Sequence, residues 1–226
     1  MRIKIAHLYY DLLNLYGEIG NIISLKNALE YQNVKADIIN LSINDSIDFN
    51  KYDFIYIGSG TEDNILLALN HLKKYKKELK RYIEDNKFFL STGNSLDLFG
   101  SFIKNNGLKL FDYSSSISEK RIVNEVICKS KLSNKEIIGF YNHAYKTTNI
   151  ESPFFEIEQL NIKDGIIYNN FYGTHILGPI LVRNPHLLEY IVMKLILQKD
   201  KNFKFKKFNF SLENKAYNLS IKNLKQ

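Results

Sequence analysis

Residues 88–95, Phe-Phe-Leu-Ser-Thr-Gly-Asn-Ser, decide the fold, because an apolar run of strand length passes directly into a turn that contains a glycine. A strand that is apolar on both faces is typical of a parallel sheet covered by helices on both sides. The stretch Tyr52–Ile57 repeats the arrangement and ends in Gly58-Ser59-Gly60. The two stretches predict an open α/β sheet with any site in the crevice along the carboxyl ends of its strands.

Strand and helix patterns alternate through the first half of the chain. Ile3–Tyr9 and Val34–Leu41 have the pattern of strands, and a helix pattern begins near Gly20-Asn21. A longer helix pattern covers Asp63–Asp85, with a break near Lys73. The alternation predicts a three-layer α/β fold with a mostly parallel, doubly wound sheet of the flavodoxin-like kind.

The turn at residues 93–95 should be followed by a helix whose apolar residues are Leu96, Leu98, Phe99 and Phe102. The second half of the chain then changes to strands joined by short turns. These expected strands are Ile122–Cys128, Ile137–Tyr141, Phe154–Leu160 and Gly165–Leu177. They predict an antiparallel extension of the main sheet.

Two helices are expected near the C-terminus. Asn184-Pro185 opens the first, because proline suits the first helical position. Ser211 is the expected N-cap of the second. The family-like part of the chain, residues 1–198, is predicted to form one domain, and residues 199–226 a basic tail that ends in this helix.

Composition excludes several classes of protein. The chain has 226 residues, of which 45% are hydrophobic, too many for a disordered protein. Cys128 is the only cysteine, so no disulfide can form within the chain, and its apolar strand indicates inert packing. No stretch approaches the roughly 20 apolar residues that span a bilayer, and the N-terminus lacks a signal peptide's apolar region. The sequence predicts a cytoplasmic protein.

The formal net charge is +7, but lysine supplies most of the 31 basic residues. Nucleic-acid recognition favours arginine, because its planar fork binds two acceptors at once. The densest basic run lies within residues 73–81, where apolar residues at helical spacing leave the lysines on an outer face. The charge is therefore interpreted as a solvated surface, and no nucleic-acid partner is expected.

Two turns could carry chemistry. The Gly58–Gly60 turn offers backbone N–H groups for an anion or an oxyanion, although two glycines can simply permit a sharp turn. Gly93-Asn94-Ser95 lies where many α/β enzymes place a nucleophile on a strained elbow, but its tip has no nucleophilic atom. Ser95 is more simply an N-terminal cap of the following helix.

The histidines are scattered. His143 follows a strand and His175 lies before Gly178-Pro179, and either residue can be structural. No pair of histidines has the spacing of a metal site, and one cysteine cannot build a thiolate site. No metal and no cofactor are expected.

Several segments together resemble a known family. They are His7-Leu8-Tyr9, Leu13–Gly17, Gly20-Asn21-Ile22, Gly139–His143, and Gly173–Leu181 with Asn184. They resemble the glutamine amidotransferase subunits of lipid II isoglutaminyl synthase, in the cobyric acid synthase-like branch of the class I glutamine amidotransferases. The resemblance covers most of residues 3–198 in order.

The resemblance implies a reaction and a partner. In that family a cysteine thiolate attacks the side-chain amide of glutamine, a histidine assists, and ammonia passes to a Mur-ligase-like, ATP-dependent synthetase in a heterodimer. Here Gly93 stands at the position of the cysteine and Leu177 at that of the histidine. The resemblance therefore implies no intact catalytic centre in a subunit for peptidoglycan D-glutamate amidation. It places substrate binding at four residues: Gly58, Gly60, Asn94 and Arg121.

Two alternatives remain open. An active hydrolase or transferase would use Thr92 or Ser95 with His175, and it requires these residues and His143 to converge within hydrogen-bond reach. A binding module would instead hold a small amide or carboxylate at the Gly58–Gly60 turn and Arg121.

Overall fold

The computed structural model describes residues 1–103 and 106–226, and its main sheet has six strands. Their order is β10 (Ile166–Tyr168), β11 (Phe171–Thr174), β4 (Phe88–Thr92), β3 (Phe54–Ile57), β1 (Arg2–Leu8) and β2 (Lys35–Leu41). Neighbouring strands are parallel except for the edge strand β10, which is antiparallel to β11. The predicted parallel sheet is confirmed.

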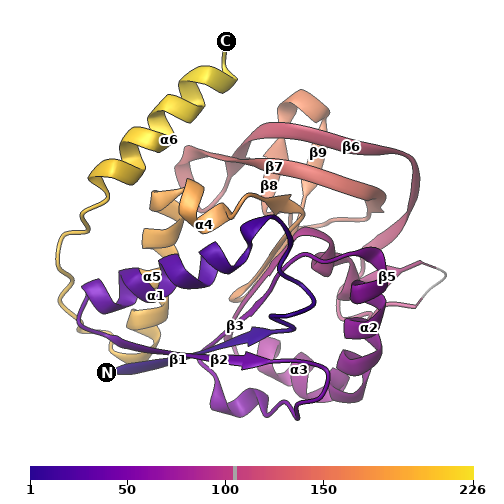
Figure 1. The fold of residues 1–226 in the computed structure, drawn as a ribbon, viewed down its shortest axis with the longest axis horizontal. Coiled ribbons are helices and arrows are strands. Elements are labelled where there is room, and N and C mark those ends of the chain that lie inside the picture. Colours follow the sequence, from indigo (N-terminus) through magenta and orange to yellow (C-terminus); the bar gives the residue numbers. More distant parts are fainter. Residues whose placement is uncertain (104–105) are drawn as a thin grey trace.

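Helices cover both faces of this sheet. On one face α1 (Ile19–Tyr31) and α5 (Pro185–Lys199) share a core with the strands. On the other face lie α2 (Glu62–Leu72) and α3 (Lys76–Glu84), joined by the short 3₁₀ helix Lys73–Tyr75 (Figure 1). This 3₁₀ helix is the predicted break near Lys73. The predicted three-layer α/β class is confirmed.

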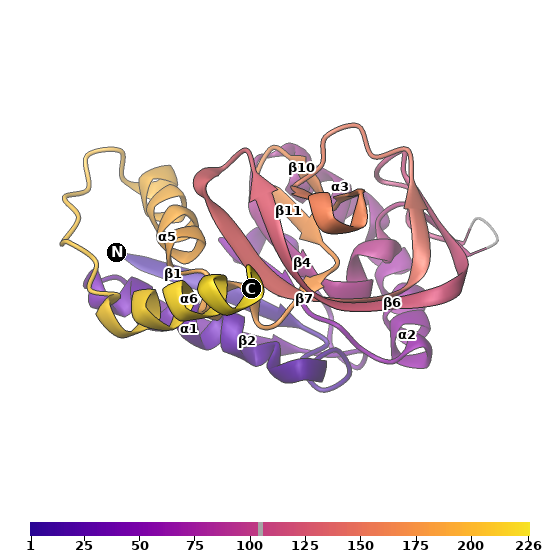
Figure 2. The ribbon, with the colours of Figure 1, turned by 90° about the horizontal axis from the view of Figure 1, so that it is seen from above.

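A second sheet extends the domain. It contains the long hairpin β6 (Ser114–Ser130) and β7 (Ser133–Thr148), with β12 (Ile176–Leu177) on one side and β8 (Phe155–Ile157) and β9 (Ile162–Asp164) on the other. A short strand, β5 (Ser101–Phe102), pairs in parallel with β6. Figure 2 shows the β6–β7 hairpin curving along one side of the molecule. The antiparallel extension is confirmed.

The single strand predicted over Gly165–Leu177 is wrong, because the chain forms β10, β11 and β12 there. Asn169 has a φ of 55°, which turns β10 back into β11. β11 then ends before His175, whose backbone N–H donates to the Asp164 carboxylate. The segment Gly165–Leu177 therefore contributes strands to both sheets, β10 and β11 to the main sheet and β12 to the second.

The helix predicted after Gly93 is also wrong. Residues Gly93–Leu98 form a 3₁₀ helix, and Phe102 lies in β5. The cause is a distant segment: the backbone N–H groups of residues 108, 110 and 109 donate to the carbonyls of Leu98, Phe99 and Gly100 respectively. A continuing helix would need those carbonyls for its own residues.

The C-terminal residues pack against the main body. After α4 (Ile180–Arg183) and α5, four phenylalanines contact the apolar core: Phe203, Phe205, Phe208 and Phe210. The Gln32 side chain donates to the Lys206 carbonyl and accepts from the Lys206 N–H. The last helix, α6 (Ser211–Leu224), contacts α4, α5, β6 and β7 (Figure 2). Ser211 is its first residue and makes no capping bond, so the predicted N-cap is wrong.

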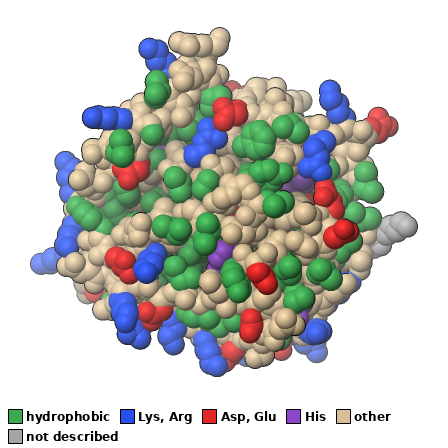
Figure 3. Space-filling model, viewed as in Figure 1, with side chains coloured by type: hydrophobic (Ala, Val, Ile, Leu, Met, Phe, Trp, Pro, Cys, Tyr) green, Lys and Arg blue, Asp and Glu red, His purple; other side chains and the backbone are tan. Residues whose placement is uncertain are grey.

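The remaining regular elements are short 3₁₀ helices at Leu15–Gly17, Phe49–Lys51 and Glu158–Leu160. Among the described helices, none combines the length and the apolar character needed to cross a bilayer. The lysines of α3 point outward while Leu79 and Tyr82 are buried, as predicted. Figure 3 shows basic side chains spread around the outline of one face and interspersed with acidic ones.

Candidate functional site

The two glycine turns lie side by side at the carboxyl edge of the main sheet. β3 pairs with β4 in parallel, with Ile57 opposite Ser91, so the turns that follow meet at the same edge. Gly93 has a φ of +66°, a left-handed conformation that side-chain-bearing residues rarely adopt. The backbone therefore keeps the geometry of a nucleophile elbow.

The space above Gly93 is filled by other side chains. A Cβ atom at position 93 would lie 2.6 Å from Cδ2 of Leu177, 2.6 Å from Cβ of Ser59 and 2.7 Å from its Oγ. All three distances are shorter than real Cβ atoms show. No nucleophilic side chain fits on this elbow unless Leu177 and Ser59 move.

The neighbouring glycine turn is occupied by Asn94. The Asn94 Oδ1 accepts hydrogen bonds from the Gly60 N–H, at 3.1 Å, and from the Ser59 hydroxyl, at 3.0 Å. Its Nδ2 donates to the Gly60 carbonyl at 2.7 Å. The chain's own carboxamide therefore uses the backbone donor that the sequence predicted for a substrate amide.

A buried polar network lies behind the elbow. The Glu18 side chain is fully buried, and its Oε2 accepts hydrogen bonds from the hydroxyls of Tyr56, at 2.7 Å, and Thr92. The Tyr56 hydroxyl also accepts from Asn21 Nδ2 at 2.9 Å. Burial raises the pKa of Glu18 to about 7, although the bonds from Thr92 and Tyr56 oppose this shift. The other carboxyl oxygen, Oε1, has no hydrogen-bond partner among the described residues.

The hydroxyls of Thr92 and Ser95 have partners of their own. Thr92 bonds with Glu18 and Tyr56, as described above. Ser95 Oγ bonds with Ser91 Oγ and donates to backbone carbonyls. Neither hydroxyl is hydrogen-bonded to a histidine, and Ser95 does not cap a helix, so the predicted cap is wrong.

Two of the predicted histidines do come together, around residues that sequence reasoning missed. Asp97 Oδ2 lies 2.9 Å from His143 Nε2, and Asp97 Oδ1 lies 3.1 Å from His175 Nε2. The second ring nitrogen of His175, Nδ1, lies 2.7 Å from Asp164 Oδ1. All four side chains are buried. We call these four residues the Asp–His cluster.

Electrostatic interactions within the Asp–His cluster shift the pKa values of its two histidines in opposite directions. Burial alone would lower the pKa of His175, but Asp97 and Asp164 raise it to about 10. Burial, followed by the charge of His175, lowers the pKa of His143. Burial would raise the pKa of Asp97, but the two imidazoles overcome this and hold it well below its usual range. His175 is therefore the charged imidazole and His143 the neutral one.

Residues 4–185 match the family of CobB/CobQ-like glutamine amidotransferase domains. The chain belongs to this family. The chain is also similar to two curated relatives, both called lipid II isoglutaminyl synthase (glutamine-hydrolyzing) subunit GatD. The relative from Staphylococcus aureus is 28% identical over 97% of this chain and 95% of its own length. The relative from Streptococcus pneumoniae is 25% identical over 88% of this chain and 82% of its own length.

Solved structures of glutamine amidotransferases share the fold. One from Thermotoga maritima has a TM-score of 0.54 at 10% identity and covers 99% of this chain and 92% of that one. Another glutamine amidotransferase has a TM-score of 0.58 at 11% identity, over 84% of this chain and 97% of that one. The class I glutamine amidotransferase-like fold expected from the sequence is confirmed.

Arg121 lies at the outer edge of the amidotransferase domain and is paired. Its Nη2 lies 2.6 Å from the Glu62 carboxylate, and its Nη1 donates to Asn142 Oδ1 at 2.9 Å. Asn142 in turn donates to the hydroxyl of Tyr16 at 3.0 Å. Arg121 therefore joins β6 to the start of α2, and any ligand carboxylate there would compete with Glu62.

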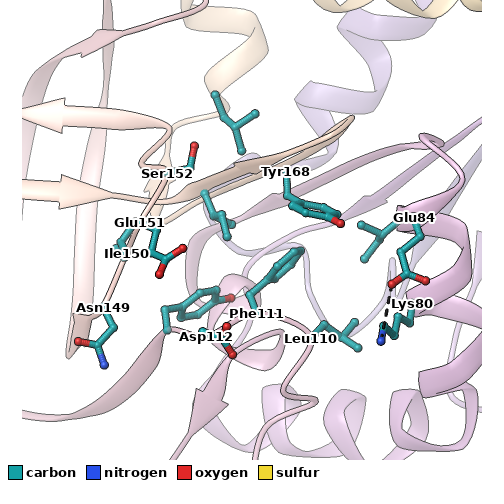
Figure 4. Close-up of a pocket in the computed structure, with 14 residues that line it drawn as sticks. Lys80, Glu84, Leu110, Phe111, Asp112, Asn149, Ile150, Glu151, Ser152 and Tyr168 are labelled. Atoms are coloured by element: carbon teal, nitrogen blue, oxygen red, sulfur yellow. Dashed lines mark ion pairs between the residues drawn. The ribbon is translucent and has the colours of Figure 1, made fainter.

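Two cavities lie away from the elbow. The first, of about 350 Å³, is lined by α3, β10 and two loops, with Phe111 and Tyr168 inside and the Lys80–Glu84 ion pair at its margin (Figure 4). The second, of about 560 Å³, lies in the second sheet and reaches Asp164 and His175. Neither is lined by Gly93 or Leu177. The second cavity therefore borders the Asp–His cluster at Asp164 and His175.

Proposed function

We propose that this chain is the amidotransferase-like subunit of a two-subunit enzyme that amidates the D-glutamate of a peptidoglycan precursor. In this role it assembles with a Mur-ligase-like, ATP-dependent synthetase and does not itself hydrolyse glutamine. The observation that carries the proposal is that Gly93 has no nucleophilic side chain, and that a side chain at this position would displace Leu177 and Ser59.

Glutamine hydrolysis by this family requires a nucleophile, a base and donors for the developing oxyanion. Gly93 offers no nucleophilic atom and Leu177 no base. The third requirement is compromised too, because Asn94 already bonds to the N–H of Gly60. Removal of a single member of such a catalytic set costs roughly three orders of magnitude or more in rate. The proposed subunit therefore fixes the conformation of its partner, which takes ammonia from solution.

The test is amidation by the assembled complex. The full chain is co-purified with a Mur-ligase-like synthetase, and amidation of lipid II is measured with ATP and either glutamine or ammonium chloride. We expect co-purification, amidation with ammonium and no glutamate release from glutamine. The proposal fails if the two chains do not associate, or if glutamate release is robust and is abolished by Ser95→Ala but not by the exposed control Ser211→Ala.

The rearranged hydrolase requires Thr92, Ser95, His143 and His175 to converge. The hydrogen bonds given above divide them instead: Thr92 bonds to Glu18, Ser95 bonds to Ser91 and to backbone carbonyls, and the histidines bond to Asp97. We therefore set this alternative aside. The binding module for a small amide requires Asn94 to leave the turn, and a prediction below tests this.

We also propose that residues 1–198 form the amidotransferase-like domain and that residues 199–226 are an appended segment. The family match covers residues 4–185, which lie within the first of these parts. We propose the cytoplasm as the compartment, supported by the free thiol of the buried Cys128, since unpaired cysteines are usual in reducing compartments.

A further inference from the structure

The Asp–His cluster has the composition of a metal site. Asp97, His143 and His175 each offer one ligand atom, and these three atoms lie within 4.8 Å of one another in the protein interior. Two imidazole nitrogens with one carboxylate are a common ligand set for divalent transition metals. The cluster lies beyond the Gly93 turn, on residues that the proposed function does not use.

Asp164 supplies an independent indication. It accepts from the ring nitrogen of His175 that faces away from Asp97, at 2.7 Å, and from the Thr174 hydroxyl at 2.6 Å. Metal-binding histidines in proteins usually donate their second ring nitrogen to a carboxylate, which fixes the tautomer and aims the free nitrogen at the metal. His175 is held in this way, with Nε2 directed at the Asp97 carboxylate.

The charges of the cluster also favour a cation. Asp97 and Asp164 are both buried, and the ion pairs that the described residues make with them come from histidines alone, not from lysine or arginine. Buried carboxylates are stabilised by pairing or by metal coordination. One divalent cation would balance the negative charges of both carboxylates.

The distances are close to those of a zinc site. The Asp97 oxygens lie 2.9 and 3.1 Å from the two imidazole nitrogens, whereas ligands about 2.0–2.1 Å from a tetrahedral zinc ion are about 3.3 Å apart. The ring centroids of His143 and His175 are 3.8 Å apart and their ligand nitrogens lie within 4.8 Å of each other, so a modest rotation of one ring brings the nitrogens to zinc-ligand spacing. His143 can do so, because its Nδ1 has no hydrogen-bond partner among the described residues.

We propose that Asp97, His143 and His175 bind one divalent transition-metal ion, with Asp164 orienting His175. Binding releases the Nε2 proton of His175 to solvent and moves the proton of His143 from Nε2 to the unpartnered Nδ1. The cavity of about 560 Å³ is lined by His175 and Asp164, so a metal ion would approach the cluster from this side. This proposal is independent of the proposed function.

The test uses the full chain without a histidine tag. After chelation and dialysis, the chain is titrated with Zn²⁺ and with Co²⁺, and we measure bound metal by mass spectrometry, the visible Co²⁺ spectrum and the unfolding temperature. We expect about one equivalent of Zn²⁺ per chain, visible Co²⁺ bands and a Zn²⁺-dependent rise in unfolding temperature. Wild-type protein that binds less than about a tenth of an equivalent, with no thermal shift, overturns the proposal.

Substitutions in the Asp–His cluster test whether the metal binds there. His143→Ala loses a single hydrogen bond and should fold, and we expect it to weaken Zn²⁺ binding at least 100-fold, while Asp164→Asn weakens it about 10- to 100-fold. The control is His186→Ala, because His186 is also an unpartnered histidine but lies in α5 outside the cluster. Stoichiometric zinc that survives His143→Ala, or that is lost equally in His186→Ala, contradicts this site.

Discussion

The side chain of Leu177 lies where a side chain at position 93 would have to be, since a Cβ atom there would come within 2.6 Å of Leu177 Cδ2. Gly93 and Leu177 are therefore close neighbours, and neither carries a nucleophilic or basic group. The lack of a nucleophile at Gly93 and the lack of a base at Leu177 therefore belong to the same packing arrangement.

Gly93→Cys alone should therefore destabilise the protein and yield no glutaminase. It combines left-handed backbone strain with overlap against Leu177 and Ser59, together about 2–4 kcal/mol. The matched control is Gly17→Cys, because Gly17 has a φ of +73° and open space around its Cβ position. It should cost only the backbone strain, about 1 kcal/mol. Urea unfolding measures both, and equal losses would contradict the packing argument.

Restoring both catalytic groups and the space for them should restore chemistry. The triple variant Ser59→Gly/Gly93→Cys/Leu177→His supplies nucleophile, base and room, and we expect slow glutamate release in the presence of the synthetase, slow because Asn94 still bonds to the Gly60 N–H. The double variant that keeps Ser59 should be less active, because its hydroxyl still crowds the cysteine. A folded triple variant without any release would show that other residues also block hydrolysis.

Asn94→Gly should free the glycine turn. It removes the carboxamide that bonds to Gly60 and Ser59, at a cost of about 1–3 kcal/mol in stability. We expect glutamine at millimolar concentration to shift the amide resonance of Gly60 in the variant and not in the wild type. Glutamine binding to the wild type with equal affinity would contradict a turn closed by Asn94.

Glu18→Gln should flatten the pH dependence of stability. The pKa of Glu18 rises from 4.5 in the unfolded chain to about 7 in the folded one, so the folded state binds more protons between these values. This contribution is fully present below pH 4.5 and is lost as pH rises through 7, by up to about 3 kcal/mol. Urea unfolding between pH 5 and 8 should show a smaller decline in Glu18→Gln than in wild type. The exposed control Glu213→Gln should follow wild type, and identical slopes in all three would contradict the shift.

Asn184→Ala should be among the most destabilising substitutions outside the apolar core. The buried Asn184 side chain accepts from the N–H of Ile138 and donates to the carbonyls of Ile138 and Ile180, joining the second sheet to α4. Its loss leaves buried backbone groups without partners, which costs about 2–4 kcal/mol. Asn27→Ala, on the exposed face of α1, is the control and should change stability by less than about 0.5 kcal/mol. Equal effects would contradict the role of Asn184.

The parts of the fold that sequence predicted are those that local pattern determines. The buried runs before Gly58 and Gly93 predict parallel strands because each is apolar on both faces. The helix after Gly93 failed because residues 108–110 take its carbonyls, which no local window can show.

The candidate site also contains residues that the sequence located and residues that it missed. Gly93 and Leu177 could be located through the resemblance, but the consequence of their contact required the structure. The Asp–His cluster was missed because its members come from three separate elements and the bend between β11 and β12, and their ligand spacing exists only after folding. Glu18 was missed as well, although an acidic residue between Gly17 and Gly20 was a visible signal.

The filled elbow also constrains how such a chain can change over generations. Gly93 adopts its left-handed conformation without strain, whereas a residue with a side chain would be strained there. A single reversion to cysteine meets Leu177 and Ser59, and a single histidine at position 177 finds no thiol to assist. Each first step back therefore costs stability or gains no activity. The packing around Gly93 therefore opposes the return of catalysis by any single substitution.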